Sequence, residues 1–377
     1  MIPEPKLLIP GPTPVPQAIF QAMLTPMTNH RGAEVMALRQ SLVERLQRLW
    51  SSTGPVGLLA SSGTGGLEAI LTNACARGDR VLAVSAGAFG ERFGSVAERA
   101  GLDVDWLRLP WGAAAQPDEI AARLRGGDFH AVLLIHNETS TGVLHPIAEI
   151  AAAIRDDVRL ILVDSISGTP STPVDLDGWG VDAVVASSQK GFMMPPGLGL
   201  VGLGAHALER FRGRPSLYFD LSGAARGEWS YTAPLSLVFG LARSLDLLEE
   251  EGDERRYGRH RLMAAMVRAG AEALGFGVRA PRAYASPTVT VVEPPAGVSN
   301  HAIRAWCQEH GAIVAGGIGQ WQDQALRIGH VGATGPLDML MALDVMELAL
   351  AEVGGLDVDG RGARAALEVW RRTIHAE

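Results

Sequence analysis

The strongest indication of architecture in this 377-residue chain is the stretch HAVLLIHNETSTGVLHPIAEIAAAIRDDVRLILVDS, residues 130–165. Apolar runs open and close it, HAVLLIH at 130–136 and RLILVDS at 159–165, and residues 147–155 between them have the pattern of a helix. Two continuous apolar strands joined by a helix are typical of a parallel sheet that is covered on both faces. The stretch therefore predicts an α/β fold.

The same alternation extends to both sides of this stretch. Residues 34–50 predict an amphipathic helix, because apolar residues recur along one stripe. Further strands are predicted at VGLLA (56–60), VLAVSA (81–86), VDWLRL (104–109), DAVVAS (182–187) and LGLVGL (198–203), with helical windows at 66–76, 90–100 and 117–125. We therefore expect a mainly parallel sheet of seven strands between layers of helices.

The pattern changes from about Ala233 onward. Long helical windows at 234–251 and 253–274 lead to shorter elements: a strand TVTVVE (288–293), a helix near 299–310, a strand ALRIGHV (325–331) and a helix near 336–353. These predict a smaller C-terminal α+β domain. We expect an N-terminal segment at 1–30, a large domain at 31–252 and a small domain at 253–377.

The composition is that of an ordinary globular protein, with 47% hydrophobic and 20% charged residues. A net charge of −8 disfavours nucleic acid or an anionic membrane as the main partner. No apolar run reaches the roughly 18 residues of a membrane span, and the proline-cut N-terminus lacks the apolar region of a signal peptide. Cys75 and Cys307 form no CxxC pattern, so we expect no metal site and a cytoplasmic protein.

Lysine is scarce in this chain. It occurs only at Lys6 and Lys190, whereas arginine occurs 31 times. Arginine is effectively always protonated and cannot form a Schiff base, so a lysine that is retained indicates a need for its amine. The alternative is that the composition is biased against lysine and that Lys190 remains by chance.

A glycine-rich loop, Ser61-Ser62-Gly63-Thr64-Gly65-Gly66, directly follows a predicted strand and precedes a predicted helix. Glycines let a ligand approach the backbone, and a helix N-terminus offers free N–H groups to an anion. The loop therefore favours phosphate binding, with a plain glycine-rich turn as the alternative. It matches neither the Walker loop nor the dinucleotide fingerprint.

Three charged residues lie within or just after predicted strands. Asp164 ends RLILVDS, and Lys190 follows another strand 26 residues later, so both are expected at the carboxyl edge of the sheet, where ligands bind. Arg327, in ALRIGHVG of the smaller domain, offers a guanidinium fork for a carboxylate. For each residue the alternative is an ordinary turn, capping or surface role.

The order and spacing of these segments resemble those of the class V aminotransferases, especially the alanine–glyoxylate and serine–glyoxylate group. The resemblance extends from LLIPGPTPVP through TNHRG, SSGTGGLEA, HNETSTGVLHP, VDSISGTP and SSQKG to LRIGHVG. It implies a fold-type I, pyridoxal-phosphate-dependent transferase. The donor would be a small amino acid, alanine or serine, and the acceptor a 2-oxo acid, glyoxylate or pyruvate.

The resemblance also implies roles for particular residues. Lys190 resembles the lysine that holds pyridoxal 5′-phosphate as a Schiff base, and Asp164 resembles the partner of its ring nitrogen. The remaining cofactor contacts would be Ser62, Gly63, Thr64 and Gln189 at the phosphate, Phe89 and Ile166 on the two faces of the ring, and Thr139 beside it. Phe89 stands where the family often has tryptophan. Arg327 resembles the clamp for the substrate carboxylate.

The resemblance further implies a homodimer with shared active sites. Tyr231 and Thr232, in the segment from Trp229 to Thr232, would reach the neighbouring subunit's phosphate, and Asn29 and Arg31 would project toward its substrate pocket. Two alternatives stay open on the same fold: a lyase of the cysteine desulfurase type, and a catalytically inactive cofactor-binding protein. Against the first, Cys75 and Cys307 fall inside predicted helices, and Gln189 stands where that branch commonly has histidine.

Overall fold

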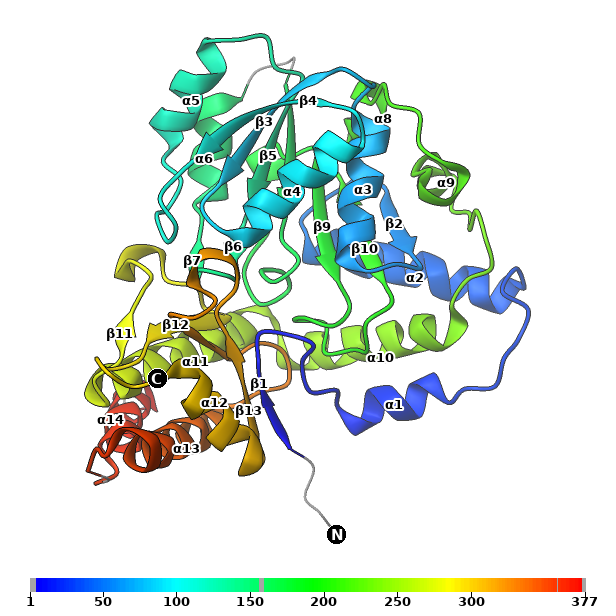
Figure 1. Ribbon diagram of the computed structural model, residues 1–377. Coiled ribbons are helices and arrows are strands. Elements are labelled where there is room, and N and C mark those ends of the chain that lie inside the picture. Colours follow the sequence, from blue (N-terminus) through cyan, green and yellow to red (C-terminus); the bar gives the residue numbers. More distant parts are fainter. Residues whose placement is uncertain (1–4, 156–158, 358, 375–377) are drawn as a thin grey trace.

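A computed structural model describes residues 5–155, 159–357 and 359–374 of the chain. It contains two main sheets, each covered by helices (Figure 1). The larger sheet has seven strands in the order β2-β10-β9-β8-β5-β3-β4. These strands are β2 (Val56–Leu59), β3 (Arg80–Ser85), β4 (Asp103–Arg108), β5 (Ala131–Ile135), β8 (Leu160–Asp164), β9 (Ala183–Ser187) and β10 (Gly199–Leu203).

The larger sheet confirms the predicted architecture. All seven predicted strands form, and their pairings are parallel except those of β10, which is antiparallel to both of its neighbours. Six of the strands are buried on both faces or nearly so, as their continuous apolar sequences predict. Parallel strands end at the same edge, so the carboxyl ends of β3, β5, β8 and β9 meet there.

Helices cover both faces of this sheet. One face is packed by α3 (Gly63–Ala74) and α4 (Ala88–Arg99), around a core that includes Leu67 and Phe93. The other face is packed by α2 (Ala33–Leu49), α5 (Pro117–Arg125), α6 (Ile147–Ile154) and α10 (Leu235–Glu251), with α1 (Gln17–Met23) against α10. Side chains of β3 alternate between the two cores, as the pleat of a strand requires.

The smaller sheet has five strands in the order β1-β13-β14-β12-β11. They are β1 (Lys6–Leu8), β11 (Gly277–Val278), β12 (Val289–Glu293), β13 (Ala312–Gly316) and β14 (Leu326–Gly329). Their apolar core packs against α11 (Asp253–Ala273), α12 (Asn300–Glu309), α13 (Pro336–Gly354) and α14 (Arg361–Ile374). Strand β1 comes from the other end of the chain and runs parallel to β13, so the N-terminal segment is fastened to the C-terminal sheet (Figure 1).

Short elements complete the chain between the larger ones. They are the two-stranded sheet of β6 (Asn137–Glu138) and β7 (Val143–Leu144), and the one-turn helices α7 (Leu176–Trp179), α8 (Ala207–Arg210) and α9 (Ser222–Ala225). The edge-to-face contact of Trp111 with Trp321, at 5.9 Å between ring centroids, joins a loop of the large-sheet region to the small-sheet region. None of the described helices is both long and apolar enough to cross a bilayer.

Candidate active site

A cavity of about 210 Å³ opens at the carboxyl edge of the larger sheet. Nine of the eleven predicted cofactor contacts line it: Ser62, Gly63, Thr64, Phe89, Thr139, Asp164, Ile166, Gln189 and Lys190. They come from segments up to 128 positions apart, and the shared strand edge brings them together. Leu67, Arg92, Asn137 and Ser167 also line the cavity, and the sequence analysis did not single them out.

The glycine-rich loop supplies the start of α3. The first-turn amides of Thr64 and Gly65 donate to no other group in the described ranges, which leaves them available to an anion. Glycine at 63 leaves room for Ile166, because an added Cβ would lie 2.6 Å from its Cδ1 and 3.1 Å from Cβ of Ser187. The N–H of Gly63 donates to Oγ of Ser187 at 3.0 Å, which connects the loop to the strand that precedes Lys190.

Asp164 ends β8 and is only 5% exposed. Its Oδ1 accepts the N–H of Ile166 at 2.8 Å, which orients the carboxyl group. The pKa of Asp164 is raised to about 7. Burial is the main cause and the negative charge of Glu138 adds to it, while the Ile166 amide, Lys190 and Arg92 act in the opposite direction. A cation placed beside this carboxyl would be strongly favoured, because it would compensate the buried charge.

Lys190 lies three residues after β9 and is half-buried in the cavity wall. Its Nζ donates to the carbonyl oxygen of Pro10 at 2.7 Å. The pKa of Lys190 is lowered to about 8. Burial is the main cause and the positive charge of Arg327 adds to it, while Asp164 acts in the opposite direction. An amine with this pKa is partly neutral near pH 8 and is therefore a competent nucleophile and base.

Arg327 lies on β14 of the smaller sheet, close enough to lower the pKa of Lys190 by its charge. Its Nε donates to the carbonyl oxygen of Gly316 at 2.8 Å, and its two terminal nitrogens have no partner among the described residues. Burial lowers the pKa of Arg327 to about 10, with Glu138 as the opposing negative charge. A fixed guanidinium with two free donors suits a carboxylate.

Phe89 and Thr139 face the cavity from two connected segments. The guanidinium carbon of Arg92 lies 5.0 Å from the centroid of the Phe89 ring, one helical turn further along α4. Thr139 donates from its hydroxyl to Oγ of Ser167 at 2.5 Å, and Ser167 in turn donates to the carbonyl oxygen of Asn137 at 3.0 Å. This network fixes the polar side of the cavity.

Arg327 does not line this cavity, and four other predicted residues also lie outside the cavity of their own chain. Asn29 and Arg31 are exposed in the loop before α2, where the Asn29 side chain accepts the Arg31 N–H at 3.0 Å. Thr232 is exposed, and the hydroxyl of Tyr231 accepts the N–H of Ala60 beside the glycine-rich loop at 2.9 Å. Their predicted partner is a neighbouring subunit, so their roles stay predictions.

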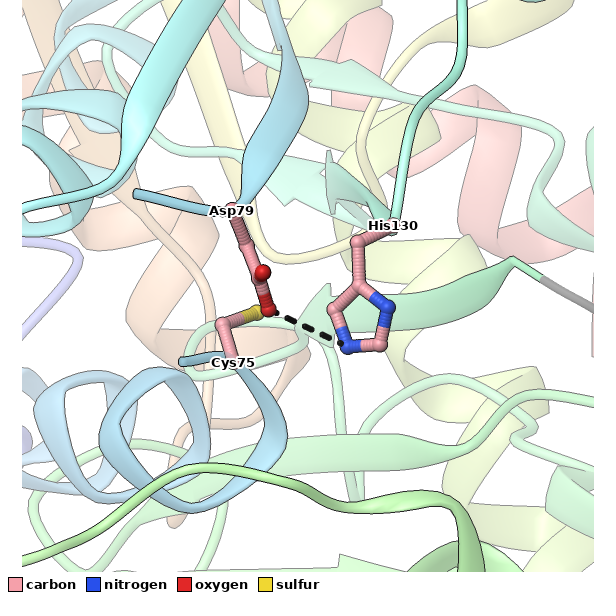
Figure 2. A group of neighbouring side chains, drawn as sticks. All are labelled: Cys75, Asp79 and His130. Carbon is pink, nitrogen blue, oxygen red and sulfur yellow. Dashed lines mark ion pairs between the residues drawn. The ribbon is translucent and has the colours of Figure 1, made fainter. Parts of the chain in front are cut away.

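One cluster of possible metal ligands occurs in the described part of the chain: Cys75, Asp79 and His130 (Figure 2). Hydrogen bonds already engage two of these groups. Arg212 and the Ala76 amide donate to the carboxylate of Asp79, and Nε2 of His130 lies 3.0 Å from the carbonyl oxygen of Ala74. A carbonyl only accepts, so this nitrogen carries a proton and is not free to bind a metal.

The two thiols are also unsuited to nucleophilic chemistry. Cys75 and Cys307 are buried and do not line the cavity. Burial raises the pKa of Cys75 to about 12 and that of Cys307 to about 11, whereas a reactive cysteine needs a lowered value. The geometry therefore disfavours the desulfurase alternative.

Comparisons with known proteins agree with the site. Residues 9–320 of this chain match the model of the family described as "Aminotransferase class-V". A serine–glyoxylate aminotransferase of Methylorubrum extorquens is 35% identical over 381 residues, covering 96% of this chain and 94% of that protein. A protein of a Synechococcus species described as the small subunit of a soluble hydrogenase is also 35% identical, covering 96% of this chain and 97% of that protein.

The solved structures include the same architecture. The ureidoglycine–glyoxylate aminotransferase of Bacillus subtilis superposes with a TM-score of 0.93 at 27% identity, covering 98% of this chain and 99% of that one. The seven-stranded sheet, the smaller mixed sheet and the cavity define a fold-type I transferase that uses pyridoxal phosphate. The chain belongs to the class-V aminotransferase family and is a pyridoxal-phosphate-dependent aminotransferase.

Proposed function

We propose that this enzyme moves an amino group from a small amino acid, alanine or serine, to glyoxylate or pyruvate. The observation that carries the proposal is that Arg327, on β14 of the smaller sheet, is close enough to Lys190, just after β9 of the larger sheet, for its charge to lower the pKa of the amine. The two terminal nitrogens of Arg327 have no partner among the described residues. Amino and oxo acids share a carboxylate next to the reacting carbon, so one clamp serves both.

The cavity fits pyridoxal 5′-phosphate on the evidence of its donors. Free amides and hydroxyls at the start of α3 suit the phosphate, Phe89 and Ile166 suit the two ring faces, and Asp164 suits a protonated ring nitrogen. When bound, this cofactor supplies an electron sink. Lys190 would hold it through its amine and carry the proton at the substrate's α-carbon, while Asp164 would keep the ring nitrogen protonated.

The names of the relatives support a small donor and glyoxylate as acceptor. The relative from Methylorubrum and the solved structure from Bacillus are both named for glyoxylate. Aspartate, aminoethylphosphonate and pyridoxamine remain alternative donors.

We also propose that two copies of the chain share their active sites. A second, outer hollow of about 480 Å³ adjoins the cavity, since Thr64 and Arg92 line both. Asn29, Arg31 and Thr232 are exposed polar residues without a role in their own cavity. In a twofold dimer each copy would lend such residues to the other, and both sites would form together.

A donor and acceptor panel tests the proposed reaction. Alanine, serine and aspartate are each offered with glyoxylate, pyruvate or 2-oxoglutarate, and the amino product is measured by mass spectrometry. We expect glyoxylate or pyruvate with alanine or serine to give the largest kcat/KM. A preference for aspartate with 2-oxoglutarate would refute the substrate assignment. Arg327→Lys keeps the charge but loses the fork, so it should raise KM for every carboxylate substrate.

A further inference from the structure

We propose that the N-terminal segment Ile9–Thr13 is a positioning element of the active site, and that the carbonyl oxygen of Pro10 holds the free amine of Lys190. The inference deepens the proposed function and rests on it, because there Lys190 supplies the amine. The segment belongs to the far end of the chain, about 180 positions before the lysine.

The first support is the hydrogen bond itself. The Nζ atom of Lys190 donates to the Pro10 carbonyl at 2.7 Å, and within the described ranges this is the only hydrogen bond of the lysine side chain. In the proposed function the amine first holds the cofactor and later carries a proton. While the amine carries the proton it is not bonded to the cofactor. A hydrogen-bond acceptor in the cavity wall then keeps the amine inside the cavity instead of in solvent.

The second support is the backbone conformation of Gly11 and the lack of space beside it. Its φ of +129° is a conformation that side chains rarely adopt. A Cβ built there would also lie 2.5 Å from Nζ, 2.6 Å from Cδ and 2.8 Å from Cε of Lys190. The lysine chain therefore lies directly on the backbone of Gly11, and the position has room only for glycine.

The third support is a pair of hydrogen bonds from Thr13, two residues after Gly11. The hydroxyl of Thr13 donates to the carbonyl oxygen of Lys190 at 3.1 Å, and the Thr13 amide donates to the carbonyl oxygen of Gln189 at 3.2 Å. The segment thus binds the backbone of the lysine as well as its amine. A segment that only covered the surface would not need these two hydrogen bonds to the backbone of Gln189 and Lys190.

The segment is itself held by the smaller sheet. Leu8 of β1 pairs with Val314 of β13, and an added Cβ at Gly329 would lie 2.2 Å from the backbone of Ile9. Gly329 lies two residues after Arg327 on β14. The amine is therefore positioned from the same sheet that carries the proposed carboxylate clamp.

The scarcity of lysine permits a direct test in the full chain freed of cofactor. A trace of acetic anhydride labels neutral amines, and mass spectrometry separates Lys190 from Lys6, which is exposed and serves as the internal reference. The titration midpoint of Lys190 labelling then reports the surroundings of its amine. For the unmodified chain it should lie near the pKa of about 8 that burial imposes.

Gly11→Ala should displace the amine from Pro10 and relieve its burial. Loss of the Pro10 acceptor by itself lowers the midpoint of Lys190, but relief of burial, the largest cause of its lowered pKa, raises it. The midpoint should therefore rise toward the ordinary value of 10.5 by at least about one unit, while Lys6 stays unchanged. Gly297→Ala is the matched control, because Gly297 also has a positive φ of +84° but has nothing within 4 Å of an added Cβ. It should leave the Lys190 midpoint where it was.

Thr13→Val provides a second, milder variant, and Thr13→Ser its conservative rescue. We expect valine to shift the Lys190 midpoint and serine to restore it. An unshifted midpoint in a folded Gly11→Ala protein overturns the proposal. If Gly11→Ala does not fold, an unshifted midpoint in Thr13→Val overturns it instead. The measurement needs no turnover, so a failure of the proposed reaction is observed separately.

Discussion

The carboxylate of Glu138 accepts the backbone N–H of Phe89 at 3.1 Å, which ties the first turn of α4 to the end of β6, directly before Thr139. The same carboxylate accepts the N–H groups of Gly90 and Ser140, each at 3.0 Å, and is completely buried. Gly87 stands where it does because a Cβ would lie 2.6 Å from the Glu138 side chain. One buried acid therefore holds the ring that faces the cavity.

Glu138→Gln should loosen this arrangement. The glutamine side chain has nearly the same volume, but its NH2 group replaces one carboxylate oxygen. That group points a donor at backbone N–H groups, so at least one of their hydrogen bonds is lost. Losing a hydrogen bond to a charged group should lower the free energy of unfolding by about 1.5–3 kcal/mol and weaken cofactor affinity by about tenfold. Denaturant unfolding and cofactor titration measure the two effects.

The matched control is Glu91→Gln on the same helix. Glu91 pairs with Arg108 at the surface, so its loss should cost no more than about 1 kcal/mol. If Glu138→Gln were as mild as this control in both measurements, Glu138 would not hold the Phe89 ring.

Lys190→Ala should abolish turnover without unfolding the chain. The proton transfer that the amine performs is worth about a hundred- to ten-thousand-fold, and the covalent link to the cofactor is lost as well. Lys6→Ala removes the other lysine and should remain active. Treatment of the loaded unmodified protein with borohydride should place the cofactor mass on the Lys190 peptide. Activity near the unmodified level in Lys190→Ala would remove the basis of the mechanism.

Asp164→Asn should have opposite effects without and with cofactor. In the chain freed of cofactor, the pKa of Asp164 is about 7 instead of 3.8, so its ionisation costs stability as pH rises from 3.8 to 7 and the cost is fully present above 7. Asparagine cannot ionise, so the variant should be more stable at pH 8, by at most about 4 kcal/mol, and equally stable at pH 3.5.

Once the cofactor is loaded, the same substitution should be harmful. A carboxylate favours the protonated ring nitrogen, so Asp164→Asn should slow exchange of the substrate's α-proton more than it weakens cofactor binding. Deuterium exchange of alanine, followed by NMR, measures this rate. Unchanged exchange, or an Asp164→Asn protein that is less stable at pH 8 without cofactor, would argue against this carboxyl as the ring's partner.

Mixed dimers test whether the sites are shared. Thr232 is exposed and has no hydrogen bond to a described residue, so Thr232→Trp should be harmless to its own subunit but should block the partner's cavity. Neither Lys190→Ala nor Thr232→Trp dimers should turn over. A hybrid of the two combines one intact lysine with one intact Thr232, and we expect up to about half of the activity per hybrid. An active Thr232→Trp protein, or inactive hybrids of confirmed composition, would contradict sharing.

Sequence patterns predicted the layered part of the fold because each of its elements carries its own signal. Six of the seven strands of the larger sheet are buried, nearly continuous apolar runs, and α10 and α11 coincide with the two long helical windows at 234–251 and 253–274. Strand β1 was not predicted, since three residues beside prolines carry no period and its partner β13 is about 300 positions away. The helix α14 was missed as well, although its apolar stripe packs on α11.

The same distinction holds for the site: residues with a local signal in the sequence were predicted, and residues without one were missed. Asp164 and Lys190 could be predicted because Asp164 ends an apolar strand and Lys190 lies three residues after another, and position at a strand end is visible in sequence. Arg92 was missed, since it is one arginine among 31 and its place one turn after Phe89 becomes meaningful only when α4 is laid beside the cavity. The acceptor at Pro10 is a backbone carbonyl, for which no residue type is diagnostic.

The pairing of β1 with β13 has a consequence for the order of events during synthesis. Residues 6–8 leave the ribosome about 300 residues before their partner at 312–314. Until then the larger sheet can collapse around its own strands, whereas Pro10 has no sheet to hold it beside Lys190. A nascent chain would therefore acquire its sheet early and its complete lysine environment late, as expected for a contact of such long sequence separation.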